Sequence, residues 1–302
     1  MTKFPISCRA LAVSLALTMV LNPAVHSAES IRGDFAERPT EPVIERGWKI
    51  LPLDLIARLF ALPNELLLWN HKLQNRNVSE ETLEDLRQYM IYYQLEDVKV
   101  RVNKAAFVDE YRRLFTNKKM HWAIRIPFGF LTTTISLITE RILAGDYYNP
   151  FNDTIHIFSD ITPVVVHEAG HARDFDRQSN RGFYALMRIV PGMDLIQEDE
   201  ASSSAIKYFI EKGDHATEIE AYKILYPAYG SYIGSYFGFI LPFSIGSIGA
   251  ILGGHWFGRH KAREVSQKYR LSEEKLRYQD QQIQRQKALH TKNSPLPSAT
   301  SL

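Results

Sequence analysis

Residues 164–171 read VVVHEAGH, and the two histidines in this segment constrain the fold more than any other feature of the chain. On an α-helix, side chains four positions apart lie one turn above each other on the same face, so His167 and His171 can reach a single metal ion. Glu168 then points to the edge of the same site. The segment is therefore predicted to be a helix that carries two metal ligands and an adjacent carboxylate.

The cysteine content limits which metal this helix can hold. The chain of 302 residues contains one cysteine, Cys8, and it lies in an N-terminal segment that we expect to be removed. A thiolate zinc cluster, an iron–sulfur site and a disulfide framework are thereby excluded from the mature chain. The ligands must be histidine and carboxylate, and zinc is the metal that this combination predicts.

A catalytic zinc ion takes a third protein ligand and leaves a fourth position for water. An acidic run, residues 198–200, begins a predicted helix downstream of the motif. We expect Glu200 to be the third ligand, because small serine side chains share its helical face and leave room for a metal. The acidic side chains before it are equally explained by the helix dipole. The alternative third ligands are Glu198, Asp174 and Asp194.

Four residues carry a resemblance to a known family: His167, Glu168, His171 and Glu200. They follow a predicted strand at residues 154–158 and resemble the gluzincin group of zinc metallopeptidases over about residues 146–226. The resemblance implies a zinc-bound water, Glu168 as the general base, and an edge strand that holds a peptide or protein substrate. The chain departs from this family at two positions. Members linked to membranes commonly have the sequence Glu-Ala-Asp from the third ligand onward, whereas this chain has Ser202 in place of the Asp. On the motif helix, Arg173 replaces a residue that is usually apolar.

The first 28 residues have the build of a secretory signal peptide. A basic start, with Lys3 and Arg9, precedes an apolar run over residues 10–21 and small residues that end at Ala28. An uncleaved anchor or an organelle presequence is the alternative. We expect a catalytic domain on the extracytoplasmic side of the cell membrane, periplasmic or equivalent.

Residues 224–258 contain no Asp, Glu, Lys or Arg and are predicted to contact membrane lipid. Glycines at positions 230, 234 and 238 are four apart, a spacing that lets two apolar helices approach closely and predicts self-association into a homo-oligomer. One span over residues 233–257 is favoured over a glycine hairpin. The basic cluster that follows this segment then marks the cytoplasmic side.

Two further segments gave specific expectations. Residues 126–139 carry no charge but are too short to span a bilayer, so they predict a buried core helix in preference to an interfacial one. His156 alternates with Ile155 and Ile157 and is expected to be an exposed strand histidine. The candidate donors to a tetrahedral oxyanion are Tyr208, His215, Tyr222 and Tyr226.

The complete expectation is a mainly helical α+β protein: a zincin-like catalytic domain with a small sheet, and a C-terminal glycine-rich transmembrane segment. The predicted division is a signal peptide (1–28), an N-terminal arm (29–53), a metallopeptidase domain (54–223), a membrane segment (224–258) and a basic polar tail (259–302). The formal net charge of +2 gives no case for nucleic-acid binding. The alternative function is a noncatalytic membrane protein that has a structural or vestigial metal site and associates through its glycine-rich segment.

Overall fold

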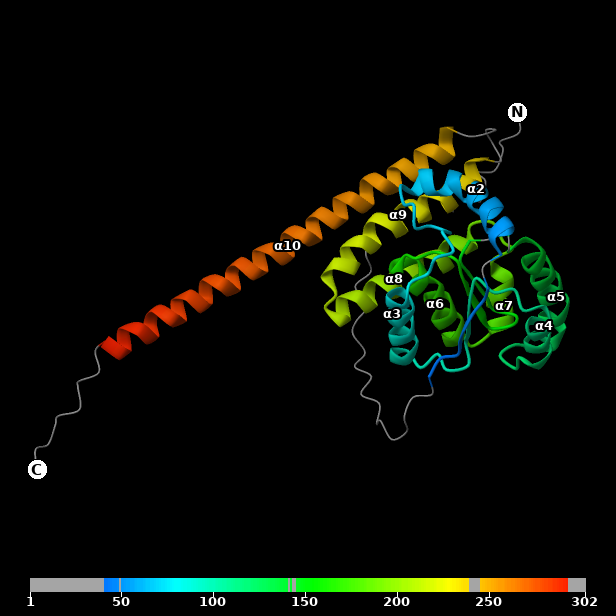
Figure 1. Ribbon diagram of the computed structural model, residues 1–302, viewed down its shortest axis with the longest axis horizontal. Coiled ribbons are helices and arrows are strands. Elements are labelled where there is room, and N and C mark those ends of the chain that lie inside the picture. Colours follow the sequence, from blue (N-terminus) through cyan, green and yellow to red (C-terminus); the bar gives the residue numbers. More distant parts are fainter. Residues whose placement is uncertain (1–40, 49, 141, 143–144, 239–244, 293–302) are drawn as a thin grey trace, which may run out of the picture.

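The computed structural model describes residues 41–48, 50–140, 142, 145–238 and 245–292, and it is mainly helical with one small mixed sheet (Figure 1). The predicted signal peptide lies outside the described residues. The strands are β1 (Ile44–Arg46), β2 (Lys99–Val102), β3 (Tyr147–Asn149) and β4 (Thr154–Ile157). The helices are α2 (Leu51–Leu68), α3 (Glu80–Tyr92), α4 (Phe107–Thr116), α5 (Trp122–Thr139), α6 (Thr162–Arg177), α7 (Arg181–Met187), α8 (Met193–Lys212), α9 (His215–Gly238) and α10 (Ile245–Lys292).

The sheet has the order β1-β2-β4-β3, with β1, β2 and β4 parallel and β3 antiparallel to β4. Strand β4, which directly precedes the motif helix α6, therefore pairs on both sides. The expectation of an edge strand at this position is wrong, because the three residues of β3 return along β4 and cover it. Part of the predicted N-terminal arm, in turn, is ordered as β1 by its pairing with β2.

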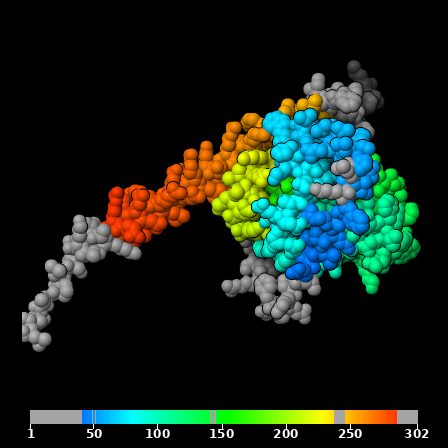
Figure 2. All heavy atoms as spheres, viewed as in Figure 1, coloured from blue at the N-terminus to red at the C-terminus, as the bar shows by residue number. Residues whose placement is uncertain are grey.

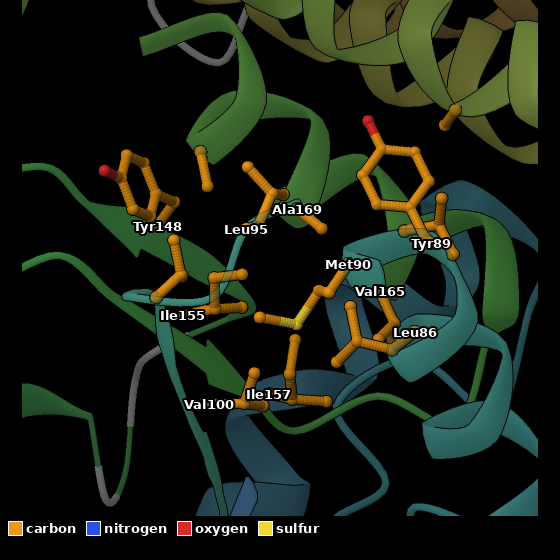
Figure 3. Packing of buried hydrophobic residues seen from close by; sticks show 14 of the residues in the cluster. Leu86, Tyr89, Met90, Leu95, Val100, Tyr148, Ile155, Ile157, Val165 and Ala169 are labelled. Carbon is orange, nitrogen blue, oxygen red and sulfur yellow. The ribbon is translucent and has the colours of Figure 1, made fainter. Parts of the chain in front are cut away.

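One face of the sheet packs against α3 and α6 and forms the main core (Figure 3). Val100, Ile155 and Ile157 point from the strands toward Leu86 of α3 and Val165 of α6. All five side chains are inaccessible to solvent. Alternation along the strands thus places branched apolar residues on the side that carries the motif helix.

The opposite face of the sheet is covered as well, and it holds charged residues. His156 and Arg101 point to this side, where they meet Glu110 of α4 and Glu140 at the end of α5. His156 is 1% exposed, so the expectation of an exposed strand histidine is wrong. The alternation of the strand was predicted correctly, but sequence alone did not show that α4 and α5 cover its second face.

Helices α6 and α8 pack closely enough to exclude a side chain between them. A Cβ added to Gly170 would lie 2.6 Å from the carbonyl oxygen of Ala201. Helix α6 begins at Thr162 with Pro163 in its first turn, so it includes the whole predicted helical segment 164–171. The glycine within the HEAGH segment therefore sets how near α8 comes to the two histidines.

Helices α9 and α10 fold back on each other, so a single continuous span over residues 233–257 is not formed. Gly230 and Gly234 of α9 face the backbone of Ala250 and Ser247 on α10, where added Cβ atoms would lie 2.5 Å and 2.8 Å from backbone atoms. These two glycines therefore pack two helices of the same chain against each other. Beyond this pair α10 continues as a long polar helix that projects away from the rest of the molecule (Figure 1; Figure 2).

Among the described residues, the helix that is long and apolar enough to cross a membrane is α5, and only 22% of it is buried. The expectation of a buried core helix over residues 126–139 is therefore wrong. The apolar composition was read correctly, but most of the large side chains face outward. Composition says how apolar a helix is, whereas neighbouring elements decide which side they cover.

Candidate metal centre

Helix α6 carries His167 and His171 on one buried face, as their spacing predicts. The two imidazole centroids are 4.7 Å apart and their planes are inclined by 82°. Val165, Val166 and Ala169 fill the core beside them, and both histidines keep only a small exposed area. The helix therefore presents two ring nitrogens to the same point, next to α8.

Helix α8 completes the cluster with Glu198. Its Oε2 atom lies 3.1 Å from His167 Nε2 and its Oε1 atom lies 3.4 Å from His171 Nε2. Glu200, the predicted third ligand, is exposed, so the prediction is corrected to Glu198, one of the alternatives left open. Side chains two positions apart on a helix point in directions that differ by about 200°. Glu200 therefore lies on the side of α8 that faces away from the histidines.

The other two alternatives for the third ligand are engaged elsewhere. Asp174 accepts hydrogen bonds from Tyr184 and Gln178, one turn beyond the histidines on α6. Asp194 accepts a hydrogen bond from Tyr236 at the start of α8. Among the described residues, His167, His171 and Glu198 are the one group of three or more potential ligands whose donor atoms converge, all within 4.8 Å.

The distances within this cluster fit a divalent cation. Zinc binds histidine nitrogen and carboxylate oxygen at about 2.0–2.2 Å, which in tetrahedral geometry separates two ligand atoms by about 3.3–3.6 Å. The 3.4 Å separation between Glu198 Oε1 and His171 Nε2 lies in that range, and the 3.1 Å separation between Oε2 and His167 Nε2 is slightly shorter. Two imidazoles and one carboxylate are also a ligand set that zinc accepts while one position stays open.

Three neighbours orient the ligands. Ser202, one turn after Glu198 on α8, hydrogen-bonds His167 Nδ1 at 3.1 Å and so leaves Nε2 facing the cluster. Arg188, which follows α7, donates from Nη2 to Glu198 Oε1 at 2.5 Å. Tyr232 of α9 lies beside the same carboxylate, and burial together with Glu198 raises the pKa of its phenol.

Burial and charge tune the ionisation of this group. Burial lowers the pKa of His171 to about 4, which favours the neutral imidazole that binds metals. Burial alone would raise the pKa of Glu198, but the two imidazoles hold it well below its usual value. Burial raises the pKa of Glu168 to about 8, so this carboxyl can hold a proton near neutral pH.

The four aromatic or histidine candidates for an oxyanion donor lie outside the cluster. Tyr208 stacks edge-on against Tyr89 in the core, and His215 stacks on Tyr269 of α10. Tyr222 donates to Glu218, and Tyr226 packs against Tyr222. The polar side chains that lie beside Glu198 are instead Arg188 and Tyr232. Sequence offered no signal for these two residues, because neither belongs to a motif and Tyr232 lies in the charge-free segment.

Comparison of the chain with protein-family models, with curated proteins and with solved structures found no match.

Proposed function

We propose that the protein is a zinc-dependent peptidase with a zincin-like catalytic centre, in which His167, His171 and Glu198 hold the metal. The observation that carries this proposal is the convergence of two imidazole nitrogens and one carboxylate beside Glu168. Bound zinc would supply a water of lowered pKa and would polarise the scissile carbonyl. We place the reaction on the extracytoplasmic side, on the grounds of the N-terminal segment.

Glu168 provides the general base in this proposal. It follows a metal ligand directly in the chain and is itself buried and unassigned to the metal. A carboxylate transfers a proton from water to a leaving amine most effectively when its pKa is close to the working pH. A zinc ion held by His167, next to Glu168 in the chain, would favour the ionised carboxylate, which is the form that accepts a proton from water.

Arg188 and Tyr232 supply the polar groups on the far side of Glu198. The guanidinium of Arg188 holds Oε1 of the ligand, and this bond fixes the carboxylate. Arg188 also lies close enough to Tyr232 and Glu168 for their charges to act on one another. We assign these two residues to the stabilisation of negative charge that develops on the substrate oxygen.

The open coordination position separates this function from a structural metal site. Structural zinc is closed by four protein ligands. Within the part of the chain that the structure describes, three ligands converge, and the hydroxyl of Ser202 is directed to His167 Nδ1 instead of the metal position. A three-ligand site favours catalysis over the structural alternative.

The test is metal analysis and peptide hydrolysis with the full chain as the expressing cell processes it. We expect one zinc per chain, cleavage of a peptide library that a chelator abolishes, and recovery on addition of zinc. Glu168→Gln should keep the zinc and lower the turnover number by about 10²–10⁴-fold, since the general base is lost. A chain that binds no zinc, or a Glu168→Gln variant with full activity, would contradict the proposal.

A further inference from the structure

Helix α2 presents the wrong face to solvent for a helix of a water-soluble protein. It turns Ala57, Ala61 and the carboxylate-bearing Glu65 toward the protein, while seven large apolar side chains, among them Leu59 and Leu66, are exposed. Soluble monomers rarely expose contiguous apolar patches beyond a few hundred Å². A surface of this kind is normally covered by a partner or a membrane.

Helix α5 repeats the same inversion. Its buried positions are Arg125, Gly129, Thr133 and Leu137, so polar and small residues predominate against the protein. Six large apolar residues of the helix are exposed: Trp122, Phe128, Phe130, Leu131, Ile135 and Ile138. Two separate helices therefore show large apolar side chains outward, and Figure 1 places both at the end of the molecule away from the free end of α10.

Three of the four tryptophans lie at or near the ends of α2 and α5. The chain contains four tryptophans, and all of them are 59–87% exposed. Trp48 precedes α2 and Trp69 follows it directly, Trp122 is the first residue of α5, and Trp256 lies on α10. An indole ring is normally well buried in a protein core, and it concentrates at the water–lipid boundary of a membrane, where one part of the ring is apolar and its N–H is hydrated.

The charges of the two helices complement an anionic surface. Helix α2 turns Glu65 inward and pairs Asp54 with Arg76, and α5 contains neither Asp nor Glu. Two cations are exposed in these parts of the chain: Arg58, which precedes Leu59 on α2, and Lys118, four residues before the start of α5. Apolar residues next to cations, without exposed acids on the apolar helices, fit the headgroups and upper acyl chains of a bilayer that contains anionic lipid.

We propose that α2 and α5 dock the protein in the plane of an anionic lipid bilayer. Neither helix is free to span it, because each is held to the protein along its other side. Gly129 of α5 packs against Leu114 of α4, and the end of α2 is tied to α10 by a hydrogen bond between His255 Nε2 and the carbonyl of Leu67 at 2.7 Å. This contact is separate from the one that the sequence predicts for residues 224–258. The inference does not depend on peptidase activity.

The experiment measures binding of the full chain, as the expressing cell processes it, to vesicles. Two double variants remove apolar side chains: Leu59→Ser with Leu66→Ser on α2, and Ile135→Ser with Ile138→Ser on α5. The matched control is Leu271→Ser with Leu276→Ser on the projecting part of α10, where the exposed fractions, 60% and 61%, resemble the 62% and 73% of the α2 pair. Circular dichroism and urea denaturation check that each variant is folded.

We expect the chain to sediment with phosphatidylcholine vesicles that contain about 30% phosphatidylglycerol, and its tryptophan emission to shift to the blue. Each of the α2 and α5 pairs should weaken partitioning by about tenfold or more, and the α10 pair by less than about twofold. Equal binding by all variants, or no binding to vesicles with or without phosphatidylglycerol, would overturn the inference. So would a dimer in solution that the α2 and α5 pairs dissociate, because a second copy would then cover these helices.

Discussion

Two buried histidine–carboxylate clusters lie on opposite sides of the sheet, and they differ in where their polar atoms point. On the α6 side, two histidine nitrogens converge on Glu198. On the α4–α5 side, His156 directs Nδ1 to Glu140 at 3.0 Å and Nε2 to Glu110 at 3.8 Å, so its two nitrogens diverge. The same residue types at similar burial thus make a potential metal centre in one place and a charge network in the other.

The charge network around His156 is also internally neutralised. Arg101 pairs with the carboxylates of Glu110, Asp109 and Glu45. Lys99 and Lys104 also pair with Glu45, so three cations face three carboxylates. Tyr147 stacks on His156 with ring centroids 4.5 Å apart. Burial disfavours the imidazolium, but the Glu110 and Glu140 carboxylates raise the pKa of His156. Burial by itself is therefore a poor guide to function. Convergence of atoms and residual access are what distinguish the α6 cluster.

The largest predicted effect separates the two carboxylates of α8. Glu198→Ala should weaken zinc binding by more than about a hundredfold, because it removes a ligand, and Glu200→Ala should change it by less than about twofold. Competition with a chromophoric chelator measures both dissociation constants. Loss of zinc in the Glu200 variant with retention in the Glu198 variant would reverse the correction that the structure makes.

The next prediction concerns a substitution that disrupts the charge network around His156. Arg101→Met leaves the buried Glu110 carboxylate without its cation, and the free energy of unfolding should fall by about 3–5 kcal/mol. Zinc stoichiometry of the folded variant should not change. Urea denaturation measures the loss, with Arg112→Met as the control, because its ion pair with Asp109 is at the surface and is worth less than about 1 kcal/mol. A variant with normal stability would contradict a structural role for the network.

A third prediction links packing to the metal centre. Gly170→Ala should force α6 and α8 apart, lower the free energy of unfolding by about 1–3 kcal/mol and weaken zinc binding by roughly tenfold. Gly249→Ala is the matched control, because an added Cβ meets nothing within 4 Å and alanine favours the helix by up to about 1 kcal/mol. If Gly170→Ala binds zinc normally, the close approach of the helices is not what positions Glu198.

The smallest effect concerns acid stability at the edge of the charge network. Burial would raise the pKa of Glu45, but hydrogen bonds from Lys104 and Lys99 lower it to about 2 from a usual value of 4.5. A lowered pKa in the folded state stabilises the protein above pH 4.5, and this contribution is lost as the pH falls through about 2.

Glu45→Gln should therefore cost about 1–2 kcal/mol at pH 7 and progressively less toward pH 2. Urea unfolding at several pH values measures this difference between the variant and the parent chain. A constant difference over the whole range would show that the effect is not electrostatic.

The elements that sequence predicted well are those whose signal is local. Alternation in β4 and the helix over His167 and His171 were confirmed, because each depends on residues within a few positions of one another. Strand β1 was missed, because three residues in a polar arm become a strand only through pairing with β2. The outward face of α5 was missed for the same reason: the apolar count of a helix does not say which side its neighbours occupy.

The sequence by itself determined that His167, His171 and Glu168 share one site, because their spacing on a single helix fixes their geometry. Only the tertiary structure decided the rest of the centre. Glu198 replaces Glu200 as the third candidate ligand because the contact at Gly170 sets the side of α8 that faces α6. The rotation of one helix against another depends on side chains distant in the sequence, and no spacing within the acidic run could have specified it.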